Sequence, residues 1–245
     1  MANLTGKVAV ITGGTSGIGL ATAENFIKHG AKVVISGRNS KGTQIAAKLG
    51  TEDVVRFCQT DVTKEESVKH LIDFTVQSFG KLDIAVASAG VSGFTTEMYD
   101  THVWMDTINS NLTGVFYLDK YALAEMKKNG KGAIINVGSA TSLVGNMGTV
   151  CYPASKHGVA GLTKSAAINS IADGVRINGV IPGFVKTPLT DAVPSDDFQR
   201  NLAMVPIKRA ADPSEVANAI NFLASDEASY VVGTMLVVDG GYTVQ

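Results

Sequence analysis

This chain of 245 residues has no excess of positive or negative charge, few cysteines and no long apolar runs. Charged side chains make up 18% of it and the formal net charge is -1. It therefore lacks the strongly basic surface that attracts nucleic acids and anionic membranes. No apolar run approaches the ~18 residues of a membrane span, and the first residues lead into a strand pattern rather than a signal sequence. We therefore expect a cytoplasmic protein with no nucleic-acid or membrane partner.

Cysteine and histidine are too few and too scattered to indicate a metal site. The two cysteines, Cys58 and Cys151, lack metal-ligand spacing and are expected to be small buried side chains, and the four histidines form no metal pattern. The sequence also lacks Pro/Ser-rich linkers and internal repeats. It therefore predicts a single domain over residues 1–245.

Short apolar, β-branched runs recur near residues 7–12, 32–36, 54–58, 83–87, 132–137, 175–181 and 234–238. Between them lie longer segments whose apolar residues recur about every 3.6 positions, as a helix packed on a sheet requires. Strands that alternate with helices predict an α/β fold. We expect a single doubly wound, Rossmann-type parallel sheet of about seven strands with helices on both faces.

The first of these runs ends in Thr12-Gly13-Gly14-Thr15-Ser16-Gly17-Ile18-Gly19, which opens an amphipathic stretch. The order strand, glycine turn, helix is typical of a dinucleotide site, because the N–H groups of a helix N-terminus can then reach a pyrophosphate with no Cβ atom in the way. The Gly-x-x-x-Gly-x-Gly spacing makes this turn one residue longer than the common fingerprint. An ordinary strand-to-helix turn is the alternative.

Gly37 and Arg38 indicate which dinucleotide is bound. They follow the second run about 20 residues after the glycines, where an NAD enzyme would carry Asp or Glu on the adenosine 2′-hydroxyl. An acid there would repel the 2′-phosphate of NADP, whereas Gly37 leaves space and Arg38 offers a planar fork of donors. The pattern favours NADP(H). Arg38 could instead be an ordinary solvated loop charge.

Tyr152 and Lys156 lie at positions i and i+4 of a predicted helix, so their side chains share one face. A phenol is a poor base at neutral pH, but a neighbouring ammonium favours the phenolate and lowers its pKa, which suits acid/base catalysis. Upstream, Ser139 follows a buried strand at its carboxyl end, where a hydroxyl could donate to a substrate carbonyl; Ser142 competes for that role. The alternative for Tyr152 and Lys156 is an amphipathic surface pair.

Together these motifs resemble those of the short-chain dehydrogenase/reductases over essentially the whole chain, through Thr12-Gly-x-x-x-Gly17-x-Gly19, Asp61, Asn111, Ser139, Tyr152-x-x-x-Lys156 and Pro182-Gly183. The resemblance implies that Ser139 orients the carbonyl and that Tyr152 is the acid/base. It also implies that Lys156 holds the nicotinamide ribose and lowers the pKa of Tyr152. Asn111 would anchor a water for proton relay.

The same resemblance implies which residues hold the cofactor. Asp61 would bind the adenine amino group, and Pro182 to Val185 with Thr187 would frame the nicotinamide carboxamide. The expected set is Gly13, Thr15, Ser16, Gly17, Ile18, Gly19, Arg38, Asp61, Val62, Ala89, Gly90, Tyr152, Lys156, Pro182, Gly183, Val185 and Thr187. One segment departs from the family pattern: Ala87-Ser88-Ala89-Gly90 replaces the usual Asn-Asn-Ala-Gly, so the amides that brace the sheet are missing. We expect a tolerated structural change.

Within the family, three segments look like the NADP-dependent R-specific secondary alcohol dehydrogenases of lactobacilli: Ile35 to Arg38, Lys186 to Leu189 and Val238 to Gln245. Members of that group are homotetramers with a magnesium ion near the C-terminal residue, which implies a homotetramer and a structural Mg²⁺ at Gln245. We expect hydride transfer between NADP(H) and a ketone or secondary alcohol.

Two other functions share these features. A 3-oxoacyl-carrier-protein reductase has the same catalytic residues, and because its carrier protein is acidic, a basic docking patch such as Lys127, Lys128 and Lys131 would favour it. A non-catalytic dinucleotide-sensing protein could also use this fold, although a pure binder needs no tuned phenol.

Residues 188–206 interrupt the alternation of strands and helices with Pro188, Pro194, Pro206 and mixed charges. They come late in the sheet and beyond the carboxyl end of a strand, which would place them over the ligand crevice. We therefore expect a substrate lid at about 188–206. The next helix begins near Asp212-Pro213-Ser214-Glu215.

Overall fold

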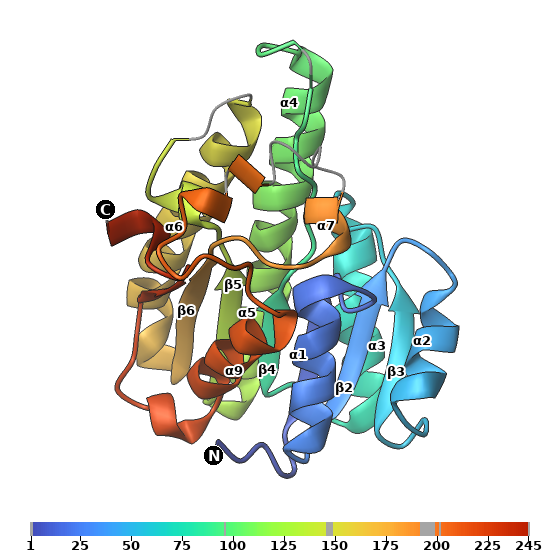
Figure 1. Cartoon of the computed structure of the whole chain (residues 1–245). Helices are drawn as coiled ribbons and strands as arrows, with labels where there is room; N and C mark the ends of the chain where they lie inside the picture. The colour runs from blue at the N-terminus through green and yellow to red at the C-terminus, as the bar shows by residue number, and fades with distance from the viewer. Residues whose placement is uncertain (1, 96, 146–148, 192–198, 201, 245) are drawn as a thin grey trace.

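The computed structural model describes residues 2–95, 97–145, 149–191, 199–200 and 202–244. A parallel sheet of seven strands in the order β3-β2-β1-β4-β5-β6-β7 forms its centre, with helices on both faces (Figure 1). This confirms the doubly wound α/β fold. No helix in these ranges is long and apolar enough to cross a membrane.

The strands fall where the sequence predicts them: β1 (Val8–Thr12), β2 (Lys32–Gly37), β3 (Val55–Gln59), β4 (Ile84–Ala87), β5 (Gly132–Val137), β6 (Val175–Pro182) and β7 (Met235–Val238). The helices are α1 (Gly17–Lys28), α2 (Gly42–Leu49), α3 (Glu65–Phe79), α4 (Thr101–Ile108), α5 (Gly114–Asn129), α6 (Cys151–Ser170), α7 (Pro188–Asp191) and α9 (Pro213–Ala224). Asp212 and Glu215 form a capping box at the start of α9, as the sequence there predicts.

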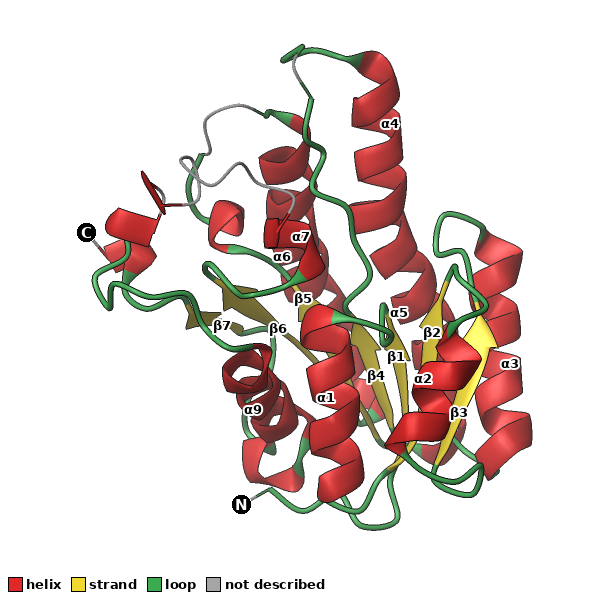
Figure 2. Ribbon diagram, turned by 45° about the vertical axis from the view of Figure 1, so that its right-hand side comes forward, coloured by secondary structure: helices red, strands yellow, loops and turns green. Residues whose placement is uncertain are grey.

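Successive strand residues are buried in two separate cores. In β1, Ala9 and Ile11 pack in the core beneath α1, α2 and α9, whereas Val10 packs in the core beneath α3, α5 and α6 (Figure 2). This alternation follows from the period of two along a strand. Because both faces are covered, the strands read as nearly continuous apolar runs. Cys58 and Cys151 are also buried, as expected.

The order of the strands reverses between β1 and β4. The chain runs from β1 outward through β2 to β3, and then crosses back to β4 on the other side of β1. In open parallel sheets a ligand binds at such a switch point, outside the carboxyl ends of the strands. Thr12 ends β1 and Ala87 ends β4, so the crevice lies between the glycine turn and the segment that follows Ala87.

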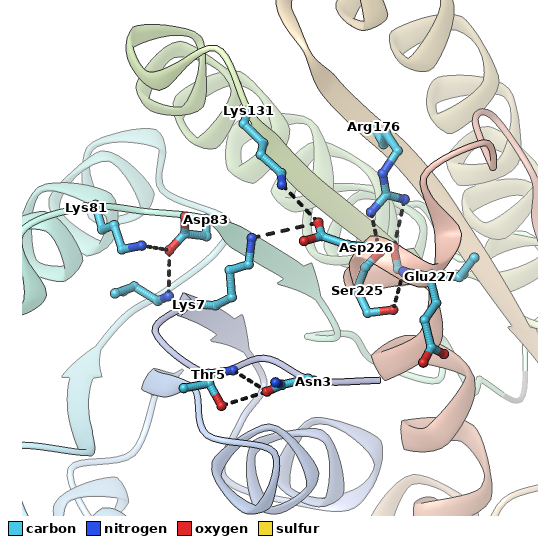
Figure 3. A network of polar contacts seen from close by, with 12 residues as sticks. Asn3, Thr5, Lys7, Lys81, Asp83, Lys131, Arg176, Ser225, Asp226 and Glu227 are labelled. Carbon is cyan, nitrogen blue, oxygen red and sulfur yellow. Dashed lines mark hydrogen bonds and ion pairs between the residues drawn. The ribbon is translucent and has the colours of Figure 1, made fainter. Parts of the chain in front are cut away.

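The opposite, amino-terminal edge of the sheet carries an ionic network (Figure 3). A cavity of about 330 Å³ lies there, lined in part by Lys7, Lys131, Arg176 and Asp226. Asp226 pairs with Lys131 at 3.0 Å and with Lys7 at 3.9 Å. Arg176 donates to two main-chain carbonyl groups at the end of α9, where helix carbonyls lack partners of their own. The network therefore fastens α9 to the starts of β5 and β6.

Candidate active site

Glycines close the turn between β1 and α1. A Cβ atom on Gly13 would lie 2.9 Å from the Ala89 Cα, and one on Gly19 would lie 2.3 Å from the Gly13 carbonyl oxygen. Ser16, at the N-cap of α1, makes no side-chain cap hydrogen bond, and the first turn contains no acidic residue. The first N–H groups of α1 thus have no competing side-chain acceptor there, which fits a dinucleotide pyrophosphate.

A cleft of about 160 Å³ lies beside this turn. It is lined by Gly13, Thr15, Ser36, Gly37, Arg38, Thr60, Asp61, Val62, Thr63, Ala89, Gly90, Val91 and Ser110. Seven of the predicted cofactor residues are among them: Gly13, Thr15, Arg38, Asp61, Val62, Ala89 and Gly90. They come from the ends of β1, β2, β3 and β4, so the structure brings together residues that lie far apart in the sequence.

Asp61 is fixed by hydrogen bonds to one of its oxygens. Its Oδ1 accepts from the Thr63 N–H at 3.1 Å and from the Thr63 hydroxyl at 2.7 Å. Burial works to raise the pKa of Asp61, but these hydrogen bonds and the charges of Lys64 and Arg38 hold that pKa below its usual range. Asp61 is therefore a carboxylate, and its other oxygen can accept an N–H from an adenine amino group.

Gly37 leaves room for Thr15. A Cβ atom on Gly37 would lie 3.0 Å from the Thr15 Oγ1, so a larger residue would push Thr15 within the cleft that both line. Arg38 is exposed beside them, and its carbonyl oxygen accepts from Gln59 at 2.9 Å. Its backbone is thereby anchored while the guanidinium is left for a ligand.

Thr12 supports the end of β4, a role the sequence analysis missed. Its hydroxyl oxygen accepts from the N–H groups of Ser88 at 3.2 Å and Ala89 at 3.3 Å. These bonds tie the end of β1 to the segment after β4, and the tolerance of Ala87-Ser88 stays a prediction. The only available signal was the place of Thr12 directly before the glycines, which by itself does not indicate a bond to a residue 76 positions away.

Asn111 lies in a single π-helical turn, η1 (Asn109–Thr113), between α4 and α5. Such turns occur frequently at functional sites. Asn111 is fully buried; its side chain donates to the Val91 carbonyl oxygen at 2.9 Å and to the Ser155 hydroxyl at 3.2 Å, and accepts from the Val91 N–H at 2.8 Å. The side-chain amide thus joins the segment after β4 to α6. The water that the family resemblance assigns to Asn111 stays a prediction.

Ser139 is the N-cap of the short helix η2 (Ala140–Ser142) that follows β5, and Ser142 is the last residue of that helix. The Ser142 hydroxyl is buried and accepts from the Ser139 N–H at 3.2 Å. The Ser139 hydroxyl bonds the Tyr152 side chain, and this bond acts to lower the pKa of that phenol. Ser139 is therefore the serine in contact with Tyr152, while Ser142 caps the turn that presents it.

Tyr152 and Lys156 lie together near the start of α6. The Lys156 Nζ is 5.7 Å from the centroid of the Tyr152 ring and donates to the Val137 carbonyl oxygen at 2.8 Å. Burial lowers the pKa of Lys156 to about 8. Burial also raises the pKa of Tyr152, against the smaller effect of Ser139. The expected lowering of the Tyr152 pKa by Lys156 is therefore not seen: desolvation of the phenol raises that pKa, and Ser139 is the group that acts to lower it.

The segment after β6 completes this edge of the sheet. Gly183 packs against Asp239, since a Cβ atom there would lie 2.8 Å from the Asp239 Cα. Thr187 approaches the glycine turn, with its Cγ2 3.0 Å from a Cβ built on Gly17. The side chain of Val185 is buried in the core. Val185 could therefore contact a cofactor only through its backbone, whereas Thr187 could contact it through its side chain.

Two expectations fall wholly or partly outside the described residues. Gln245, expected near a magnesium ion, is outside them, and no group of three or more His, Cys, Asp or Glu residues within the described ranges could hold a metal ion. Of the lid expected at about 188–206, residues 192–198 and 201 are also outside. Both expectations stay predictions.

The chain is similar over nearly its whole length to known oxidoreductases. A family model described as Enoyl-(Acyl carrier protein) reductase matches residues 13–243. The chain is 45% identical over 241 residues to a cis-4-hydroxycyclohexanecarboxylate dehydrogenase of Sinomonas cyclohexanicum, covering 97% of this chain and 96% of that protein.

Two further relatives differ in their named activities. The chain is 40% identical over 248 residues to an NADP-dependent (R)-specific alcohol dehydrogenase of Lentilactobacillus kefiri, covering 99% of this chain and 98% of the relative. It is 41% identical over 241 residues to a 3-oxoacyl-[acyl-carrier-protein] reductase of Vibrio cholerae, covering 98% of each.

Proposed function

Because the chain belongs to the short-chain dehydrogenase/reductase family of oxidoreductases, we propose that it transfers a hydride between NADP(H) and a ketone or secondary alcohol. The observation that carries this proposal is the contact of Ser139 with Tyr152, with Lys156 on the same helix face. Ser139, which follows β5, and Tyr152 and Lys156 of α6 thus lie at the carboxyl edge of the sheet, the edge that also carries the cleft beside the glycine turn.

The chemistry follows from these positions. When bound, the nicotinamide supplies a hydride to the carbonyl carbon or accepts one from the alcohol carbon. The Ser139 hydroxyl donates a hydrogen bond to the carbonyl oxygen, where negative charge develops. Tyr152 then donates its phenolic proton to that oxygen, so that ketone, hydride and proton give the alcohol. Because burial raises the pKa of Tyr152, the resting phenol already carries the proton that reduction needs.

Lys156 would have two roles. Its ammonium, buried and directed by the Val137 carbonyl, would hold the nicotinamide ribose hydroxyls. It would also stabilise the phenolate that Tyr152 becomes after it gives up its proton. Asn111 positions the helix that carries both residues, since it binds the Ser155 hydroxyl directly before Lys156.

NADP(H) is proposed as the coenzyme on the evidence of β2. Gly37 ends this strand without a carboxylate, and Arg38 is exposed at the same cleft. A guanidinium suits the 2′-phosphate, and no acidic residue at 37 opposes it. The Lentilactobacillus relative, named as NADP-dependent, is consistent with this choice.

Reduction of acyl groups on a carrier protein is the second candidate, supported by the Vibrio relative. The patch that would favour it is neutralised by neighbouring carboxylates. Lys127 pairs with Asp173, Lys128 with Glu125 and Lys131 with Asp226. An acidic carrier protein would have to displace these partners, so we favour a small ketone.

We also propose that the chain assembles as a homotetramer. Ile168 on α6 is exposed over 76% of its surface, and Tyr230 is fully exposed. Gly233 packs on Ala167, so the segment that follows Tyr230 lies beside α6, the helix that carries Ile168. Light scattering should give four chains per particle; a monomer at micromolar concentration would contradict the proposal.

A screen of neutral ketones with NADPH and NADH tests the proposed function. Loss of the reduced-nicotinamide absorbance reports turnover directly, and product analysis shows which alcohol forms. The expected result is NADPH-dependent reduction of at least one small ketone. Reduction of an acyl-carrier-protein substrate alone would favour the second candidate.

A further inference from the structure

Three stretches of sequence next to the proposed catalytic groups lack acidic and basic side chains. From Ile84 to Thr96, from Gly132 to Ser155 and from Ile177 to Val185, the sequence has no Asp, Glu, Lys, Arg or His. These ranges include the carboxyl ends of β4, β5 and β6 and the loops that leave them. They also contain Ser139 and Tyr152. A substrate carbonyl at Ser139 would thus be flanked by segments that carry none of these five residue types.

The loops after β4 and β5 touch each other beside the catalytic groups. The Thr149 hydroxyl donates to the Gly93 carbonyl oxygen at 2.9 Å, and Val91 is held by Asn111. Each loop also exposes a large apolar side chain: Phe94 is 65% exposed and Leu143 is 47% exposed. Leu143 follows η2 directly, four positions after Ser139. An apolar ligand would cover such side chains and remove their apolar surface from water, which is favourable.

Three cations of the segment after β6, Lys186, Lys208 and Arg209, are already engaged. Lys186 pairs with Asp212 at 3.1 Å, Arg209 pairs with Glu215 at 2.7 Å, and Lys208 donates to the Ala203 carbonyl oxygen. At the centre itself Lys156 donates to the Val137 carbonyl, and in the proposed function it serves the cofactor ribose. None of these four cations is placed to receive a carboxylate of the substrate.

Acidic groups stand near the start of α4 instead. Asp100 caps this helix, accepting from the His102 and Val103 N–H groups, and Glu97 is exposed just before it. Both follow Phe94 in the sequence and precede α4, the helix that projects beyond the carboxyl edge of the sheet (Figure 2). These carboxylates offer an anionic substrate no partner, and such a substrate would lose solvation in the centre.

We infer that the substrate is an uncharged, apolar ketone, and that the site discriminates against the same ketone carrying a carboxylate. The inference rests on the proposed function. It separates this chain from the Sinomonas relative, whose named substrate, a hydroxycyclohexanecarboxylate, is an acid. The two proteins would therefore catalyse the same type of reaction and differ in whether their substrate carries a negative charge.

The test compares two substrates of nearly the same shape. Methyl 4-oxocyclohexanecarboxylate is neutral, and 4-oxocyclohexanecarboxylate is its anion at neutral pH. The expected kcat/KM with NADPH is at least about 100-fold higher for the ester. A ratio below about tenfold, or a preference for the acid, overturns the inference. Failure to reduce any neutral ketone, with either nucleotide, would instead overturn the proposed function.

A variant with a new positive charge at Leu143 tests whether the uncharged residues beside Ser139 cause this discrimination. Leu143→Arg places a cation beside Ser139 and should lower the ester-to-acid ratio at least about tenfold by raising activity on the acid. Leu143→Gln, which is polar but uncharged, should not raise activity on the acid. Gln77→Arg adds the same charge near the far end of α3 and should leave both activities unchanged. If Leu143→Arg leaves the ester-to-acid ratio of kcat/KM unchanged, Leu143 does not line the substrate site.

Discussion

The Lys156 ammonium lies 5.7 Å from the centroid of the Tyr152 ring while it donates to the Val137 carbonyl oxygen. The lysine is thus held by β5 and faces the phenol on its own helix. Burial acts on both groups in the direction of neutrality, lowering the pKa of Lys156 to about 8 and raising the pKa of Tyr152. Each group has to be charged at some stage of the proposed reaction, so their pH dependence reports on the mechanism.

Replacing Lys156 by Met should weaken cofactor binding and move the remaining pH-rate limb to higher pH. The first effect follows from loss of the ribose contact, and the second from loss of the cation that stabilises the Tyr152 phenolate. Fluorescence titration with NADPH and a pH-rate profile measure the two effects separately. If both were unchanged, Tyr152 and Lys156 would be an ordinary helical pair.

Alcohol oxidation should require a higher pH than ketone reduction in the wild-type enzyme. Reduction uses the protonated Tyr152, which predominates below its raised pKa, whereas oxidation needs the phenolate to accept a proton. Rates in both directions across the neutral to alkaline range should therefore have optima in that order. Coincident optima would mean that Tyr152 is not the group that titrates.

Much of this site could be predicted from the sequence. The seven strands lie within one residue of their predicted bounds, because period and β-branched composition are local signals. Tyr152 and Lys156 share a helix face for the same reason. The role of Thr12 and the π turn at Asn111 could not be predicted, since both depend on partners distant in the sequence. The pKa of Tyr152 depends on burial, which the spacing to Lys156 does not report.

The pKa of Asp119 likewise depends on burial and could not be predicted from the sequence. This residue is buried in α5 and accepts from the Asn136 amide at 3.0 Å, while within the described residues Asp119 Oδ1 and Asn136 Oδ1 have no hydrogen-bond partner. Burial raises the pKa of Asp119 from 3.8 to about 7. A proton on Asp119 would remove its buried charge and give the carboxyl group a hydrogen-bond donor.

Stability should therefore fall as pH rises through the interval set by Asp119. Between its unfolded pKa of 3.8 and its folded pKa of about 7, the folded state binds a proton that the unfolded state has released. The free energy of unfolding thus decreases with pH across this window and levels off above it. Asp119→Asn, which supplies both a donor and an acceptor without charge, should remove this slope and add at least about 1 kcal/mol at pH 8.

Urea unfolding of the wild type and Asp119→Asn at several pH values measures this contribution. Asp173→Asn is a suitable control, because Asp173 is a more exposed surface carboxylate that pairs with Lys127. Equal pH slopes for the wild type and Asp119→Asn would show that Asp119 is ionised throughout.

Gly37→Asp should reverse or erode the preference for NADP(H). The wild type is expected to favour NADPH over NADH by at least about tenfold in kcat/KM, equivalent to about 1.4 kcal/mol. An aspartate at 37 would repel the 2′-phosphate, and its Cβ would also displace Thr15, whose Oγ1 would lie 3.0 Å away. Gly37→Ala controls for this steric effect. If Gly37→Asp and Gly37→Ala gave the same coenzyme ratio, charge at this position would not select the coenzyme.

The most direct test of the central claim is the turnover of Tyr152→Phe measured beside its affinity for NADPH. The substitution removes only the phenolic hydroxyl, so the account predicts at least about a hundredfold loss of ketone reduction, with an NADPH dissociation constant within about twofold of the wild type. A variant that keeps most of its activity while binding NADPH normally would show that Tyr152 is not the proton donor, and would contradict the account.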